Sequence, residues 1–190
     1  WEVMPLDKVA HYKNGLALQK YRPEDEANYL PVVKIAQLKK GYADSEEKAS
    51  PDITEACIID SGDIVFSWSG SLLVDIWCGG RAALNQHLFK VTSTDYPKWF
   101  YYYWTKHHLQ AFQQIAADKA VTMGHIKRSH LQEAMCIIPN REILNQGSRI
   151  IGDVVNKATE VRLEVFTLQE IRDTLLPKLL SGELRVPDAE

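Results

Sequence analysis

Two polar segments of the sequence contain the residue types that contact nucleic acid. RAALNQHLFK combines cationic, amide and imidazole side chains, and DKAVTMGHIKRSH places a second set around Gly124. Arg and Lys bind phosphates, Arg also binds guanine through two hydrogen bonds, and Asn or Gln binds adenine similarly. The glycine makes the second segment loop-like, which suits phosphate and groove contacts. The candidate DNA contacts are Arg81, Asn85, Gln86, His87, Lys90, Lys119, Thr122, His125, Lys127 and Arg128.

The overall net charge of −3 conceals one basic region. Residues 81–141 contain eight Lys/Arg against three Asp/Glu, whereas residues 1–80 contain eight against thirteen and residues 142–190 contain six against nine. Five of the six histidines also lie in the basic region. This asymmetry permits an anionic partner such as nucleic acid, but a solvated surface gives the same count. Charge alone leaves both interpretations open.

The sequence contains no familiar catalytic or nucleotide-binding motif. There is no G-x-G-x-x-G, P-loop, H-E-x-x-H or G-x-S-x-G pattern. His125 and His130 are five residues apart, so they do not share a helical face. The three cysteines, Cys57, Cys78 and Cys136, form no C-x-x-C pair. We therefore expect no catalytic residue, no metal site and three buried free thiols.

The polar segments lie in a region of short strand-like runs. These runs are rich in β-branched and aromatic residues and are separated by Gly, Asp, Ser or Asn. A helix is expected from about Pro97 to Ala117, because proline is favoured in a first helical turn. We predict an α+β fold, with a mixed, mainly β domain containing a few helices over residues 1–141. The predicted strands are Tyr29–Leu38, Ala56–Trp68, Leu72–Cys78, His87–Thr92 and Glu133–Pro139.

Residues 142–190 have the pattern of a long coiled-coil helix. A helix from about Glu142 to Leu180 would be roughly 55 to 60 Å long, so its apolar seam requires a partner helix, unless it folds back on its own domain. Pro177 is expected to kink or end the helix near Leu176, with Gly182 as a left-handed cap. Apolar or small residues at alternating spacings of three and four define the seam: Ile151, Val154, Ala158, Val161, Val165, Leu168 and Leu175.

Nothing in the sequence indicates a membrane protein. No window approaches the roughly 18 apolar residues of a membrane span, and the first residues do not resemble a signal peptide. We therefore expect a soluble, cytoplasmic protein with no membrane partner.

Several stretches, taken in order, resemble the specificity (S) subunits of Type I restriction-modification systems. The resemblance covers nearly the whole chain and depends on the order and spacing of the stretches. It implies a target recognition domain for double-stranded DNA, followed by a long helix that packs antiparallel against its counterpart. The matching stretches are PLDKVAHYKNG, YLPVVKIAQLKKG, SGDIVFSWSGS, LNQHLFKV, MGHIKRSHLQEAMCIIPN and LLPKLLSGELRV.

The resemblance also implies a non-catalytic subunit that directs adenine methylation and restriction by partner subunits. S-adenosylmethionine, ATP and Mg would belong to the modification and restriction subunits, and this chain would hold no cofactor. Family members usually have two recognition domains and two helices, whereas this chain has one of each. A homodimer through antiparallel helices, or pairing with a second half, is therefore expected. The open alternative is a coiled-coil protein interaction module with a globular head and no specific DNA target.

Overall fold

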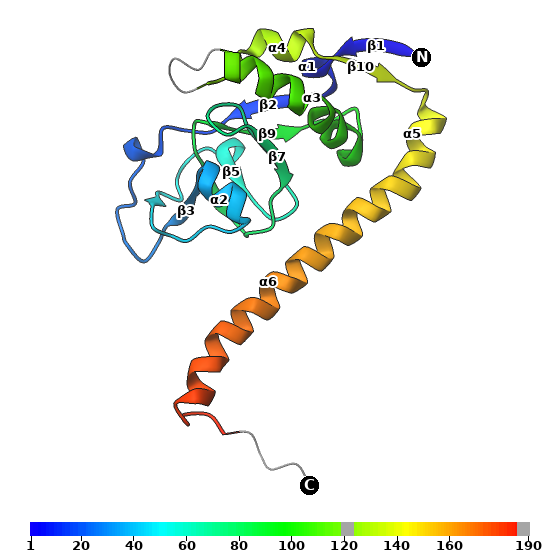
Figure 1. Cartoon of the computed structure of the whole chain (residues 1–190). Helices are drawn as coiled ribbons and strands as arrows, with labels where there is room; N and C mark the ends of the chain where they lie inside the picture. Colours follow the sequence, from blue (N-terminus) through cyan, green and yellow to red (C-terminus); the bar gives the residue numbers. More distant parts are fainter. Residues whose placement is uncertain (119–123, 186–190) are drawn as a thin grey trace.

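Two four-stranded sheets lie at the centre of the first 140 residues. The computed structural model describes residues 1–118 and 124–185 (Figure 1). The first sheet is antiparallel throughout, in the order β2 (His11–Asn14), β9 (Leu88–Thr92), β6 (Ile64–Ser67) and β7 (Leu73–Ile76). In the second sheet β3 and β8 are parallel and the other pairs antiparallel, in the order β4 (Lys48–Ala49), β3 (Leu30–Val33), β8 (Ala82–Leu84) and β5 (Ile58–Ile59).

A separate antiparallel pair joins the start of the chain to the segment before the long helix. It consists of β1 (Glu2–Pro5) and β10 (Met135–Ile138). The helices among the strands are α1 (Leu6–Val9), α2 (Ile35–Lys40), α3 (Lys98–Asp118) and α4 (Arg128–Glu133), and short 3-10 turns occupy Leu18–Lys20 and Glu55–Cys57.

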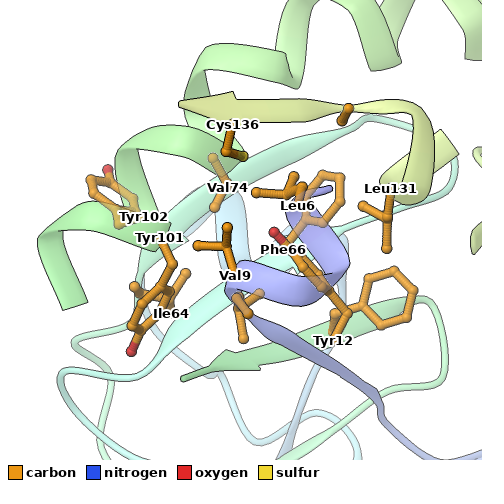
Figure 2. Packing of buried hydrophobic residues seen from close by; sticks show 14 of the residues in the cluster. Leu6, Val9, Tyr12, Ile64, Phe66, Val74, Tyr101, Tyr102, Leu131 and Cys136 are labelled. Carbon is orange, nitrogen blue, oxygen red and sulfur yellow. The ribbon is translucent and has the colours of Figure 1, made fainter. Parts of the chain in front are cut away.

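The largest core cluster lies between the first sheet, α1 and α3. Figure 2 shows Leu6 and Val9 of α1 together with Phe66 of β6 in one apolar interior, and all three are at most 1% exposed. Inside it, the Tyr12 hydroxyl is 2.7 Å from the hydroxyl oxygen of Thr105, which donates to a backbone carbonyl of α3. Burial raises the pKa of Tyr12 above its ordinary range. This buried pair ties β2 to α3.

The predicted α+β class is confirmed, but one predicted strand is half wrong. Tyr29–Leu38 contains β3, and its second half forms α2 instead. The Lys34 N–H donates to the Gln37 side chain at the start of α2, and Gly41 ends α2 with a φ of 84°. These local end contacts favour helix for an apolar run that is compatible with either structure.

The other predicted strands are present in shorter form. β6, β7, β9 and β10 lie within the expected runs. Ala56–Trp68 is divided, because Asp63 Oδ2 accepts from the Asp60 N–H within a turn between β5 and β6. Strands β1, β2, β4 and β8 were not predicted.

The long helix begins at Arg141 and includes a π-helical turn. Its parts are α5 (Arg141–Gly147), η3 (Ser148–Gly152, π-helical) and α6 (Asp153–Leu180), which are continuous in Figure 1. The sequence pattern did not predict this π turn.

The C-terminal end of α6 differs in part from the expectation. The helix continues through Pro177 to Leu180 instead of ending near Leu176. Pro177 lies in the last turn, where proline removes only one backbone donor and few turns follow that a kink would misplace. Gly182 adopts the predicted left-handed conformation, with a φ of 75°, and the Leu184 N–H donates to Lys178 O at 3.0 Å. The helix therefore ends within the expected region.

Candidate nucleic-acid interface

The turn Asn85–His87 passes from the second sheet to the first, because it connects β8 to β9. The Leu88 N–H donates to Asn85 O at 3.0 Å, and the His87 N–H donates to Asn85 Oδ1 at 3.2 Å. Asn85 is 7% exposed, so its side chain shapes the turn from inside. Gln86 and His87 are half-buried and more accessible.

The segment that follows β2 holds this turn through backbone hydrogen bonds. The Gln86 N–H donates to Leu16 O at 2.9 Å, and the Leu16 N–H donates to Leu84 O at the same distance. Gly15 makes the approach possible, because a Cβ there would lie 2.1 Å from Leu84 O. The turn thus has a fixed backbone on a rigid edge.

Trp68 and Ser69, directly after β6, hold the turn's side chains in place. The Trp68 indole N–H donates to Gln86 O at 3.2 Å. Ser69 Oγ lies 2.9 Å from Nδ1 of His87, and the Trp68 and His87 rings are 5.8 Å apart between centroids. Nε2 of His87 lies 3.4 Å from Nε2 of Gln86.

The second polar segment passes beside the same tryptophan. Ser69 forms an isolated antiparallel bridge with His125, and the Ile126 N–H donates to Trp68 O at 3.0 Å. The His125 ring lies edge-on to Trp68, with 6.3 Å between centroids. Gly124 allows a close approach to α3, because a Cβ there would lie 2.3 Å from Ala116 O. Two segments separated in sequence therefore meet at Trp68.

Arg128, at the start of α4, links this segment to the turn. Its Nη2 donates to Asn14 Oδ1 at 2.8 Å and to Tyr12 O at 3.1 Å, and its guanidinium lies 5.4 Å from the centre of the Phe89 ring. Asn14 in turn donates through Nδ2 to Gln86 O at 3.3 Å. Arg128 is exposed, so its other N–H groups are available to a ligand.

A concave pocket of about 510 Å³ adjoins the turn. Arg22 and Lys34 contribute positive charge to its wall, and Lys34 is paired with Glu47. The residues that line the pocket together with the turn are Gln19, Arg22, Lys34, Ile35, Ala36 and Glu47.

The remaining predicted contacts do not join this cluster. Arg81 lies at the opposite end of β8 and makes two hydrogen bonds to the Glu55 carboxylate, at 3.0 and 2.8 Å, which hold the pKa of Glu55 below its ordinary value. Lys90 pairs with Asp63 at 2.8 Å. Lys127 is exposed beside Arg128. The predicted contacts Lys119 and Thr122 lie outside the described residues.

The helix α6 has one face toward the sheets and another toward solvent. Val155 is 6% exposed, and Arg162 makes two 3.0 Å hydrogen bonds to Asp75 of β7. Phe166 packs at Gly41, where a Cβ would lie 3.2 Å from its ring. The predicted seam is on the other face and is exposed throughout: Ile151, Val154, Ala158, Val161, Val165, Leu168 and Leu175.

Sequence reasoning missed the residues that organise the cluster. Trp68, Ser69 and Asn14 position the turn, and Arg22 and Lys34 extend its positive surroundings. Trp68 and Ser69 have no polar motif that indicates such a role. Only the pairing of β2, β6 and β9 in one sheet brings them beside the turn.

Residues 1–118 and 124–185 offer little for metal or thiol chemistry. No group of three or more His, Cys, Asp or Glu in these ranges is placed to hold a metal ion. Cys57, Cys78 and Cys136 are free and buried, and burial raises the pKa of Cys136 to about 12. Within the same ranges, no helix has both the length and the apolar character needed to cross a bilayer.

Residues 1–165 match the model of the Type I restriction modification DNA specificity domain. The chain belongs to this family. This specificity-domain chain is 25% identical over 198 residues to the Type I restriction enzyme EcoBI specificity subunit of Escherichia coli, covering 100% of the chain and 40% of that protein. It is 26% identical over 199 residues to the MjaIX specificity subunit of Methanocaldococcus jannaschii, covering 99% and 45%. The specificity-domain chain spans less than half the length of these relatives.

Solved structures support the fold of the specificity-domain chain. The S subunit of a Type I system from M. genitalium superposes with a TM-score of 0.59 at 16% identity, covering 95% of this chain and 46% of that one. A chain from a structure of complex assembly and conformational transition of the type I R-M system gives a TM-score of 0.52 at 16% identity, covering 94% and 45%. The arrangement of a mixed domain followed by a long helix is therefore shared.

Proposed function

We propose that this chain recognises a specific sequence in double-stranded DNA as part of a Type I specificity subunit. The observation behind the proposal is the convergence of Asn85–His87 and Arg128 around Trp68 in a chain of the DNA specificity family. Amide, imidazole and guanidinium groups on a rigid backbone are suited to base edges and phosphates.

The candidate DNA contacts, inside and outside the cluster, fall into chemical classes. Gln86 and His87 are half-buried on a fixed turn and line the pocket beside it, which suits hydrogen bonding to base edges. Lys127 and Arg128 are exposed cations at the start of α4, which suits phosphate oxygens. Arg81 and Lys90 already pair with carboxylates, so their contribution to DNA binding is expected to be smaller.

The proposed role is recognition and assembly without catalysis. The modification subunit would bind S-adenosylmethionine and methylate adenine, and the restriction subunit would use ATP and Mg to cleave DNA. The names of the relatives, which are specificity subunits of Type I restriction enzymes, support this division of labour.

A second copy, or a second half of a longer protein, would complete the recognition unit. The exposed seam of α6 supports an antiparallel helix pair, because an apolar row of this spacing needs a partner. The 28 residues of α6 correspond to about 42 Å, the length of about 12 base pairs. A symmetric dimer would recognise two inverted copies of one half-site.

Selection from a randomised duplex pool, with the modification subunit present, tests the proposal. The unchanged chain should enrich one sequence at physiological salt. Gln86→Ala should relax selection at one base position and cost about 1 to 3 kcal/mol. Arg128→Ala should weaken binding to all duplexes and reduce the salt dependence by about one phosphate contact. Arg141→Ala is the matched control, because Arg141 is an exposed arginine at the start of α5.

Two outcomes would contradict the proposal. One is the absence of any enriched sequence over background. The other is an equal effect of Arg128→Ala and Arg141→Ala, which would make the cluster an ordinary solvated surface. Either result would favour an interaction module without a specific DNA target.

A further inference from the structure

The π turn η3 lies where the recognition domain meets the long helix. It contains Ser148–Gly152 and is flanked by the regular helices α5 and α6. A π turn accommodates one residue more than the α-helical turn it replaces, and such turns are rare and often functional. Side chains from α3 and from the turn itself pack around it.

The indole of Trp99, from α3, occupies a notch in the turn. A Cβ on Gly147 would lie 2.6 Å from Cζ2 of Trp99, and a Cβ on Gly152 would lie 3.4 Å from its Cδ1. The Trp99 Nε1–H donates to Ser148 Oγ at 2.9 Å, and that hydroxyl donates to Leu144 O at 2.8 Å. The ring is therefore held by two glycines and a serine.

The two glycines are present for space and not for backbone conformation. Gly147 has φ −58° and ψ −36°, and Gly152 has φ −60° and ψ −47°, values that any residue adopts in a helix. Glycine costs about 1 kcal/mol relative to alanine at each such position. The close approach of Trp99 explains why alanine is absent at Gly147, and the same ring borders Gly152.

The π turn changes which residues of α6 face the sheets. One additional residue in the turn shifts everything after it by about 100° around the helix axis relative to a regular α-helix. Without the turn, each inward position would therefore be taken by the preceding residue. The buried or half-buried residues of α6 are Val155, Thr159, Arg162, Leu163 and Phe166.

The residues that precede these five are mostly seam residues. They are Val154, Ala158, Val161, Arg162 and Val165, and four of them belong to the exposed seam. In a regular helix the seam would turn toward the sheets, and Arg162 would leave its position opposite Asp75. We infer that Trp99 and the π turn select the face of α6 that is offered to a partner helix, by keeping the seam exposed.

The inferred effect is on the rotation of α6 about its own axis, called its phase below, and the test of it requires no DNA. Failure of DNA selection would therefore leave it standing, and its own failure would leave DNA recognition standing. Its consequence for half-site pairing rests on the proposed function.

Cysteine accessibility measures the phase directly. Val154→Cys and Val155→Cys are made separately in the full chain, and their reaction with a thiol reagent is followed at a concentration where mass measurement shows a monomer. Val154 is 63% exposed and Val155 is 6% exposed, and the native cysteines are buried. The probe at position 154 should therefore react faster, by about tenfold or more.

Two perturbations and one rescue complete the design. Gly147→Ala combined with Gly152→Ala displaces the indole and raises helical propensity by about 2 kcal/mol, so the segment should become regular and the order of reactivity should reverse. Trp99→Ala should reverse it as well. Deletion of Ile150, which is 69% exposed, removes the additional residue and should restore the original order in either background.

A loss of stability alone would not reverse the order in which the two cysteine probes react. Nor would deletion of Ile150 restore the original order in that case. The inference is overturned if the probe at position 155 stays protected in both perturbed chains, or if deletion of Ile150 leaves the reversed order unchanged. If the double glycine variant does not fold, Trp99→Ala with and without the deletion decides the question.

Discussion

Substitution of seam residues should separate dimer formation from folding. We expect Val154→Glu combined with Val161→Glu to prevent association and leave the monomer intact. Their side chains are 63% and 46% exposed in the monomer, so little folding energy depends on them. Covering half of a valine contributes about 1 kcal/mol, and a symmetric dimer contains four such positions. Loss of about 4 kcal/mol of association free energy raises the dissociation constant of the dimer about 1000-fold. The cost of burying the introduced carboxylates raises it further.

Sedimentation equilibrium and circular dichroism are the appropriate measurements. The unchanged chain should have the mass of a dimer, and the variant the mass of a monomer with the same helix content. Asn156→Glu combined with Thr174→Glu is the matched control, because both positions are exposed and lie away from the seam. A dimer that persists in the Val154 and Val161 variant, or that disappears equally in the control, would refute the assignment of the seam.

Three further predictions concern the first 140 residues. Gly15→Ala should destabilise it by more than about 2 kcal/mol in urea unfolding, because the new methyl would lie 2.1 Å from Leu84 O; unchanged stability would contradict this contact. Tyr12→Phe should cost about 0.5 to 1.5 kcal/mol by removing the buried hydrogen bond to Thr105, and a stability gain would refute it. The free energy of unfolding should fall as pH rises from about 8.5 toward 12, because the folded pKa of the Cys136 thiol, about 12, exceeds its unfolded value. The Cys136→Ala variant should lack this part of the pH dependence.

The long helix was predictable because its signal is local. Spacings of three and four repeat along the chain itself, so the apolar face is visible in the sequence before any partner is known. The left-handed cap at Gly182 was also predictable from neighbouring residues alone. Strand runs such as those of β7 and β9 were also found from composition.

The composition of the candidate DNA-binding cluster was predictable only in part. Asn85, Gln86, His87 and Arg128 were chosen by residue type, and their assembly around Trp68 depends on sheet pairing across distant segments. Residue type alone did not distinguish them from Arg81, which pairs with Glu55 at the other end of β8. Side-chain partners far along the chain are decided by packing.

The sequence by itself determined that the chain has a mixed domain, a basic region and a long helix with an apolar seam. These properties follow from composition and periodicity, which act between near neighbours. Only the tertiary structure decided which face of that helix is exposed. The Trp99 ring, about fifty residues before the turn, displaces the helix by one residue at Ser148–Gly152 and thereby turns the seam outward.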